Sequence, residues 1–308
     1  MTSQMVAGDR EGNRGERSRK QDASRLLEAS AKTSYDPVVH IDWEAPLPEG
    51  RYYTPPHRCT LYGTDLWERL TEEQRIELTK HELASIASMG IWFETILMQM
   101  MVRHVYDRDP LTSHVQYAYT EIGDECRHSV MFGKMIERIG APYYRPVRLT
   151  HQLGRLFKQI SNETLTFAGA LFVEEILDQL QRETMVDESL QPLVRGVSRV
   201  HVVEEARHMR FARASFPDAW DAMGSARRAW TRHVLGQIAY IASTQLVHEQ
   251  VYAAVGLDPR PTRHVAEANP HWRESRRWAA RKAVATFEDA GLLDGPSRRW
   301  WQRAGLVD

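Results

Sequence analysis

Residues 199–211, RVHVVEEARHMRF, form the stretch of sequence that decides the fold. In a helix, offsets of four and three residues place His201, Glu205 and His208 on the same face. A helix that packs into a protein core normally carries apolar residues on that face. The positions around the three are apolar, so a solvated stripe would leave apolar side chains in water. The stretch therefore predicts a buried helix whose ionisable side chains need a reason to be buried.

Long helical segments are expected on both sides of this stretch. Apolar residues recur at the helical period, Thr71 precedes an acidic first turn, and Gly140 and Pro142 mark a stop. We expect helices at about 71–106, 112–139, 162–185 and 190–214, a fifth from Pro217 to about 255, and two shorter ones at about 271–290 and 296–304. No segment has the two-residue alternation of a β-strand. The sequence predicts an all-α bundle with additional C-terminal helices.

The N-terminal part of the chain has a different composition. Residues 1–35 are rich in Arg, Glu, Gly and Ser and poor in large apolar residues, which predicts a disordered tail. Residues 36–64 are punctuated by proline and partly aromatic, as is typical of an extended arm that lies on a helical body. Residues 65–308 then make up the helical domain.

Composition excludes several classes of function. The chain has 308 residues, of which 42% are hydrophobic and 26% charged, as in an ordinary soluble globular protein. Forty basic residues stand against 41 acidic ones, so neither nucleic acid nor an acidic membrane is an expected partner. No signal peptide is apparent, and we expect no apolar run long enough to span a bilayer. Only Cys59 and Cys126 are present, which favours a reducing cytoplasm over an oxidising compartment.

Each of the four central helices carries acidic or imidazole side chains among apolar residues. In chain order these are Glu94, then Glu125 and His128, then Glu174 or Glu175, then His201, Glu205 and His208. The order Glu, Glu-x-x-His, Glu, Glu-x-x-His is the ligand pattern of ferritin-like di-iron bundles. Four buried carboxylates are neutralised by two divalent cations, whereas a single buried carboxylate is very costly. Oxygen and imidazole ligands without thiolate suit iron or manganese better than structural zinc.

Simpler interpretations exist for each residue alone. Glu94 could be a salt-bridged residue on a helix flank, and Glu125 with His128 could be an exposed pair one turn apart. Two Glu-x-x-His matches are weak evidence as a count, because short motifs give false positives. Their positions in the middle of the second and fourth helices are stronger evidence. Together with the fourth-helix triple, they favour a metal site over isolated surface charges.

The third helix offers two adjacent acids, and only one can face the bundle interior. Neighbours in a helix differ by about 100° in direction, so Glu174 and Glu175 point to different sides. Glu174 shares its face with apolar Ala170, Leu171 and Leu177. Its more apolar surroundings favour Glu174 as the inward acid, and Glu175 stays the alternative.

The motifs resemble those of the arylamine N-oxygenase family typified by p-aminobenzoate N-oxygenase, the AurF-like non-haem di-iron enzymes. DECRH at 124–128 matches the family's Asp-Glu-x-x-His, and HVVEEARH at 201–208 matches its His-x3-Glu-x2-His. Counting back from the first His through the pair Gln191-Pro192 reaches Glu174, as in the family. The similarity extends over roughly residues 65–255 and is specific at the metal motifs.

The resemblance implies an O2-dependent monooxygenase with two iron ions. Its ligands would be Glu94, Glu125, His128, Glu174, His201, Glu205 and His208, with His201 as the extra imidazole known in this family. An electron donor, not identified, would reduce the irons, and an amine nitrogen would be oxygenated to hydroxylamine, nitroso or nitro products. The resemblance also implies a homodimer and a role in antibiotic biosynthesis. The family's basic residue about a turn before the first ligand is not apparent, since Met89 occupies that region.

Three further points follow from the same residues. Asp124 is a candidate to orient an imidazole, although a solvated acid is the alternative. Trp92, Phe93, Phe167 and Phe172 could wall an aromatic pocket, or could be ordinary core residues. Two rival functions remain, a di-iron enzyme that hydroxylates or desaturates carbon and a ferritin-like iron-handling protein.

Overall fold

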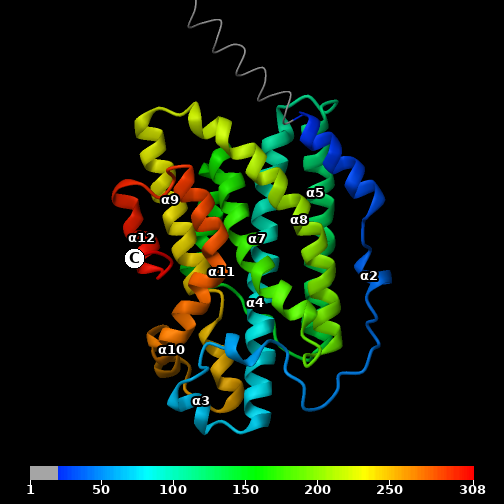
Figure 1. The fold of residues 1–308 in the computed structure, drawn as a ribbon, viewed down its shortest axis with the longest axis vertical. Coiled ribbons are helices and arrows are strands. Elements are labelled where there is room, and N and C mark those ends of the chain that lie inside the picture. The colour runs from blue at the N-terminus through cyan, green and yellow to red at the C-terminus, as the bar shows by residue number, and fades with distance from the viewer. Residues whose placement is uncertain (1–19) are drawn as a thin grey trace, which may run out of the picture.

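Four long helices form the body of the protein in the computed structural model, which describes residues 20–308. They are α4 (Glu72–Tyr106), α5 (Ser113–Arg138), α7 (Glu163–Val186) and α8 (Pro192–Asp221), and they run side by side in Figure 1. No strand occurs between residues 20 and 308. The prediction of an all-α, ferritin-like fold is confirmed.

Local sequence explains where these helices begin and end. Thr71 and Gln74 form a reciprocal capping box at the start of α4. Thr112 and Asn162 cap α5 and α7 through their side-chain oxygens. After α5 the chain turns at Gly140, whose φ of 70° is a conformation that glycine adopts without strain. These four helix ends fall within two residues of the expected boundaries.

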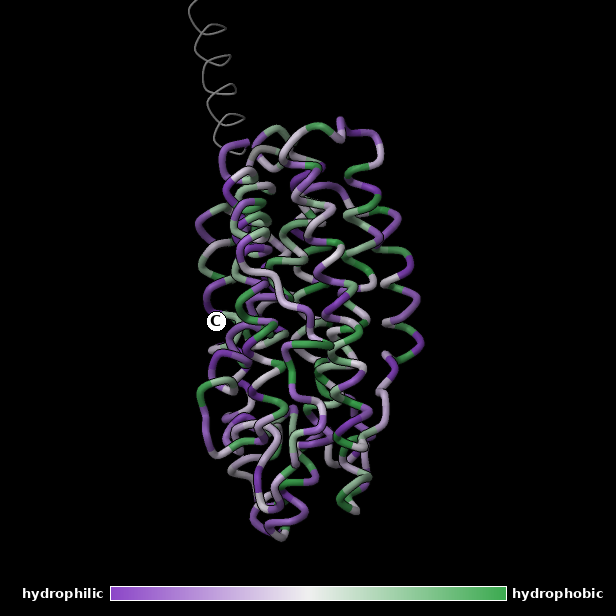
Figure 2. The backbone as a smooth tube through the Cα atoms, turned by 90° about the vertical axis from the view of Figure 1, so that its right-hand side faces the viewer, coloured by the Kyte–Doolittle hydropathy of each residue, from purple (hydrophilic) through white to green (hydrophobic). Residues whose placement is uncertain are grey.

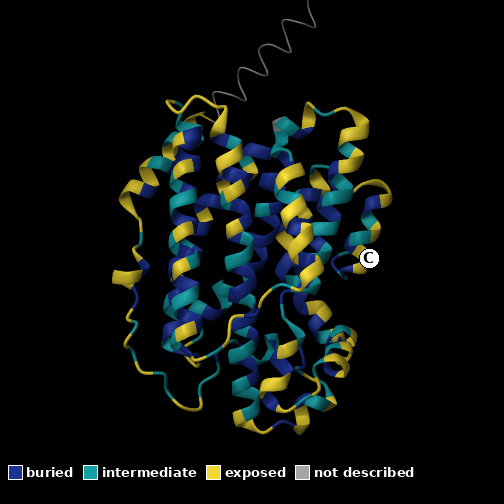
Figure 3. Ribbon diagram, turned by 180° about the vertical axis from the view of Figure 1, so that it is seen from behind, coloured by how far each residue is buried: buried dark blue, intermediate teal, exposed yellow. Residues whose placement is uncertain are grey.

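Helix α7 lies at the centre of the molecule. It packs against α8 and α4 on one side and against α9 (Ser225–Thr244) and α11 (Pro270–Asp289) on the other. Hydrophilic and hydrophobic residues alternate along the helices in Figure 2, and Figure 3 shows buried residues toward the middle of the body and exposed ones on its outer turns. The bundle core therefore continues into the C-terminal helices, which also include α10 (Pro259–Ala268) and α12 (Arg298–Arg303).

The N-terminal segment differs from the expectation over part of its length. Residues 20–32 form a helix, so a disordered tail extending to residue 35 is wrong there; residues 1–19 lie outside the described part. Ala23 and Leu26 are buried in the main core, at 1% and 4% exposure, and this burial compensates the cost of ordering. The segment then continues through α2 (Pro37–His40), a 3₁₀ turn (Pro56–Arg58) and α3 (Asp65–Arg69).

Two further boundaries differ from the expectation. Pro217 does not begin the fifth helix but lies inside α8, and α9 begins at Ser225. Buried Phe216 and Trp220 hold the last turns of α8 on the core, so packing outweighs the hydrogen bond that proline removes. The segment after α9 is a separate 3₁₀ helix (Glu249–Val255), and α6 (Arg148–Ile160) was not expected at all.

By length and composition alone helix α4 is long and apolar enough to cross a membrane, whereas the sequence predicts no such segment. It is the one such helix among residues 20–308. However, 56% of its most apolar window is buried inside the protein, and it packs against α5, α6 and α7. Its apolar length is that of a central core helix.

Helix α6 packs closely against α4 at Gly154. A Cβ atom on Gly154 would lie 2.5 Å from Cζ2 of Trp92 and 2.9 Å from Cδ1 of Ile96. We therefore expect Gly154→Ala to push α6 away from α4 and to speed amide hydrogen exchange in residues 148–160. The control is Gly133→Ala in α5, where a Cβ meets nothing within 4 Å; it should raise stability by about 0.5–1 kcal/mol. Exchange at the native rate in α6 would contradict this packing.

Glu82 of α4 fastens the extended arm and gives stability a pH dependence. It accepts hydrogen bonds from the backbone N–H and hydroxyl of Thr60 and from the thiol of Cys59. Burial raises the pKa of Glu82 to about 7. Between the ordinary pKa of a glutamate and this value, the carboxyl of Glu82 is ionised in the unfolded chain but protonated in the folded protein. The free energy of unfolding therefore falls as pH rises through this range, by about 3 kcal/mol at most.

We expect Glu82→Gln to flatten this pH dependence. Urea unfolding of the native protein and the variant at pH 5 and at pH 7.5 measures the effect. The native protein should lose more stability than the variant over this interval, and equal losses would contradict the assignment of the buried carboxyl.

Candidate metal centre

The structure brings together all seven residues proposed as metal ligands. Glu94 comes from α4, Glu125 and His128 from α5, Glu174 from α7, and the remaining three from α8. Their ligand atoms form three overlapping groups in which all atoms lie within 4.8 Å of one another. The groups are Glu125, His128, Glu205 and His208; Glu94, His128 and His201; and Glu174, His201 and Glu205. All seven are buried, and the most exposed, Glu174, is 4% exposed.

Glu205 lies at the middle of this cluster. Its Oε1 atom is 3.0 Å from Nδ1 of His208, 3.2 Å from Nδ1 of His128 and 3.6 Å from Nε2 of His201. Glu125 contacts Nδ1 of both His128 and His208 at 3.2 Å. Glu94 lies 3.8 Å from Nε2 of His201. One nitrogen of each imidazole therefore faces the carboxylates.

The other nitrogen of each imidazole has a partner outside the cluster. Nε2 of His128 lies 2.9 Å from Glu204, and Nε2 of His208 lies 3.1 Å from Asp124. Nδ1 of His201 lies 2.6 Å from the amide oxygen of Gln181. Such partners fix the ring orientation and select the tautomer that leaves the inner nitrogen free to bind a metal.

Two of these outer partners were not expected from the sequence. Glu204 precedes a ligand candidate and looked like an ordinary helix acid, and Gln181 is an uncharged residue near the end of α7. Both lie on the side of the imidazoles away from the carboxylates. Asp124 was a candidate for this role, and it does contact His208, while Arg127 forms an ion pair with its other oxygen.

The geometry separates the two adjacent acids of α7. Glu174 belongs to the cluster, whereas Glu175 forms an ion pair with Arg213 of α8. Both are buried, so burial alone does not distinguish them. The difference is the partner: a guanidinium neutralises Glu175, whereas Glu174 faces His201 and Glu205 of the cluster.

Several buried atoms of the cluster lack a hydrogen-bond partner, and this tests whether metal ions fit. The atoms without one are Oε1 of Glu94, Oε1 of Glu125, Oε2 of Glu174, Oε2 of Glu205 and Nε2 of His201. Buried polar atoms without partners are rare and costly in proteins. A metal ion satisfies lone pairs of this kind, so the residues present fit a pair of divalent cations.

The electrostatics of the cluster also favour bound positive charge. Burial raises the pKa of Glu174 well above its usual range, and the negative charges of Glu205 and Glu125 raise it further. Burial also raises the pKa of Glu94. For His128 burial opposes the charged form, but hydrogen bonds to carboxylates still raise its pKa. Without cations the positive charge comes from protons: Glu174 and Glu94 hold theirs more tightly, whereas the imidazoles beside Glu205 and Glu125 lower the pKa of these two carboxyls.

A cavity of about 330 Å³ reaches the cluster at Glu174. It lies between α4, α6, α7 and α9, and Trp92 and Phe93 form part of its wall. Phe167 and Phe172, by contrast, are fully buried core residues. Of the four aromatic residues considered for a pocket, two therefore line one.

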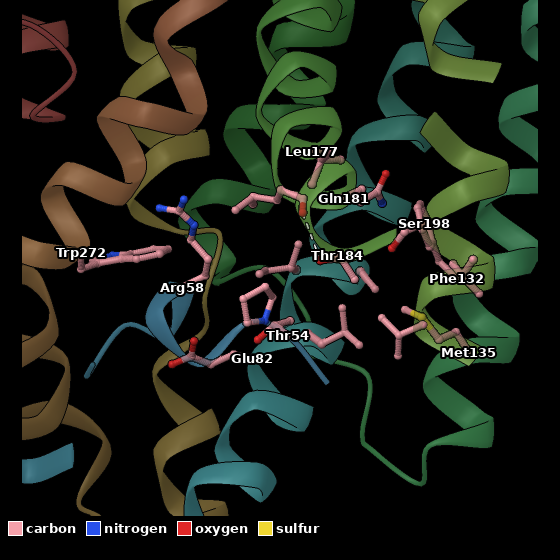
Figure 4. A pocket seen from close by; sticks show the side chains of 18 residues that line it. Thr54, Arg58, Glu82, Phe132, Met135, Leu177, Gln181, Thr184, Ser198 and Trp272 are labelled. Atoms are coloured by element: carbon pink, nitrogen blue, oxygen red, sulfur yellow. Dashed lines mark hydrogen bonds between the residues drawn. The ribbon is translucent and has the colours of Figure 1, made fainter. Parts of the chain in front are cut away.

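A second, smaller cavity of about 50 Å³ lies on another side of the cluster (Figure 4). Gln181 and Phe132 line it, and both also contact His201. Thr54 and Arg58 of the extended arm line it as well, and Figure 4 shows Arg58 on the side away from Phe132. The small cavity therefore lies between the neighbours of His201 and the extended arm.

Comparisons with known proteins agree with this geometry. A family model described as P-aminobenzoate N-oxygenase AurF matches residues 16–291. Uncharacterized protein Rv0885 of Mycobacterium tuberculosis (strain ATCC 25618 / H37Rv) and Uncharacterized protein Mb0909 of Mycobacterium bovis are each 29% identical over 196 residues. These matches cover 61% of this chain and span 57% of the length of the relatives. Since the family model covers most of the chain, including every helix that contributes to the cluster, the protein belongs to the AurF family of oxygenases.

Proposed function

We propose that the protein is a di-iron N-oxygenase that uses O2 to oxygenate an amine, with an arylamine as substrate. The seven clustered residues, Glu94, Glu125, His128, Glu174, His201, Glu205 and His208, would hold the two irons. One observation carries the proposal, namely that four buried carboxylates meet three imidazoles and have oxygen atoms without hydrogen bonds. Two divalent cations cancel the four negative charges, and each imidazole binds as a neutral ligand.

The bound irons would activate O2 and provide the oxidising power for transfer of one oxygen atom to nitrogen. In the first step R–NH2, O2, two electrons and two protons give R–NHOH and water. The electrons come from an external reductant, so an electron donor is part of the proposal. Further rounds of the same stoichiometry lead toward nitroso and nitro products.

The protein's own residues position and protect this chemistry. Glu204, Asp124 and Gln181 hold the three imidazoles in place from outside. Glu174 is the candidate ligand that lines the 330 Å³ cavity, so it lies between the cluster and the space where an amine can bind. The mostly apolar wall of the cavity limits water at the site.

Other parts of the proposal do not rest on the cluster. A cytoplasmic location follows from the composition and the two cysteines of the chain, and a homodimeric state and a role in secondary metabolism follow from family membership. An activity on carbon instead of nitrogen is separated from the proposal by product analysis, and an iron-storage role by the formation of a mineral core.

The activity is tested with iron-loaded protein, a chemical reductant and 18O2. Incubation with a panel of uncharged arylamines should give hydroxylamine or nitroso products that carry one 18O atom, detected by mass spectrometry. Glu174→Gln should lower product formation at least about tenfold, because an inward carboxylate ligand is lost. The matched control is Glu175→Gln, which alters the neighbouring buried acid that pairs with Arg213. Carbon-hydroxylated products alone, or no product from any amine, would contradict N-oxygenation.

The outer partners are tested by metal affinity. Glu204→Gln and Asp124→Asn keep the shape of each side chain but remove its charge beside an imidazole. We expect each to weaken iron binding by about 10–100-fold, measured by competition with a chelator. Glu163→Gln removes an acid at the start of α7, where it pairs with Arg108, and serves as the control. Native affinity in both variants would mean that these contacts do not orient ligands.

A further inference from the structure

Two of the helices around the 330 Å³ cavity, α4 and α7, also contribute residues to the cluster. α4 and α7 supply one part of its wall and α6 and α9 the other, with Trp300 of α12 beside them. Ala170 lines it one helical turn before Glu174. A molecule in this space therefore has one end beside the cluster and its body against apolar and aromatic side chains.

The charge of the cavity wall is its most informative property. Glu174 is the one charged residue among the described residues that line it, and none of them is Lys, Arg or His. The other polar groups, including Thr150, Gln237 and Gln245, are neutral. A bound carboxylate would lose its hydration here without gaining a cationic partner, which is very costly.

The entrance side of the cavity is apolar as well. Four residues of α6 line the cavity and are also partly exposed to solvent, and they are Leu149, Leu153, Leu156 and Ile160. The basic residues of α6 do not line it; Arg148 and Arg155 are exposed, and Lys158 donates a hydrogen bond to Gln99. An apolar molecule thus meets an apolar rim before it meets the apolar wall.

The chemistry of oxygen transfer to nitrogen favours arylamines over alkylamines as substrates. Oxygen transfer needs the nitrogen lone pair, which an ammonium ion does not have. Arylamines keep this lone pair at neutral pH, whereas alkylamines are protonated. A cation would also find no free negative charge, because two divalent cations neutralise the four carboxylates of the cluster.

We propose that this cavity is the substrate site and that it selects uncharged arylamines with an apolar ring substituent over arylamines that carry a carboxylate. The selectivity rests on the proposed N-oxygenase function. The aromatic ring packs between Trp92 and Phe93 on α4 and the leucines of α6, with the amine directed to Glu174. The substituent extends toward the apolar rim on α6.

The proposal is tested by binding, which does not depend on turnover. Calorimetric titration of the iron-loaded protein at pH 7.5 compares 4-ethylaniline with 4-aminobenzoate. We expect 4-ethylaniline to bind at least about tenfold more tightly. Gln237→Arg places a cation in the wall and should reduce this preference at least about tenfold, while the uncharged Gln237→Met should keep it.

Filling the cavity tests its location. Ala170→Phe should weaken binding of 4-ethylaniline at least about tenfold, with iron content and helical circular dichroism retained as evidence of folding. If that variant does not fold, Gln237→Trp fills the same space from α9, where Gln237 is half-buried. The proposal is overturned if 4-aminobenzoate binds as tightly as 4-ethylaniline, or if a folded, filled variant binds 4-ethylaniline like the native protein. Tight binding of 4-ethylaniline that the fillers abolish, without any oxygenated product, would uphold the site and contradict the N-oxygenase function.

Discussion

The burial of four carboxylates in one small volume is the constraint on which the structure depends. Glu94, Glu125, Glu174 and Glu205 come from four different helices and meet where water is excluded. A single buried carboxylate already costs several kcal/mol unless it is paired, and four together also repel one another. The arrangement is reasonable only if positive charge of equal size occupies the centre. In the proposed di-iron site two divalent cations would supply that charge, and the imidazoles would bind them as neutral ligands.

The outer parts of the molecule support this centre in different ways. Glu204 accepts a hydrogen bond from the backbone N–H of Tyr35 as well as contacting His128, so the N-terminal segment is tied to the cluster. Gln181 connects His201 to the small cavity beside the extended arm. On another side, α6 covers the larger cavity and is held at its C-terminal end by Arg103, which donates to the carbonyl oxygens of Lys158 and Gln159. The bundle therefore has one side whose residues contact the imidazoles of the cluster and another that carries the larger cavity.

Much of this could be predicted from the sequence, because helical period and ligand order are local properties. The spacing within 199–211 and the Glu125–His128 pair place the candidate ligands on inner faces without any knowledge of the fold. The geometry also agrees with Glu174 as the inward acid, a choice that rested on apolar neighbours. Metal binding itself stays a prediction.

The structure differs from the sequence-based expectation where contacts between distant parts of the chain determine the local structure. Helix α8 continues through Pro217 because Phe216 and Trp220 are buried against the core, and the helix at 20–32 forms because Ala23 and Leu26 are buried. Neither effect is visible in a short window of sequence. Contacts such as Glu204 with His128 join α8 to α5 across 76 positions of the chain, so sequence pattern alone could not reveal them.

We infer that two cations lie among the seven clustered side chains. The most direct test is a crystal structure of iron-loaded protein with anomalous scattering data collected on both sides of the iron absorption edge. We expect two anomalous peaks, both inside the cluster formed by the seven side chains. An absence of peaks in the cluster, or a single peak bound elsewhere on the protein, would contradict this inference.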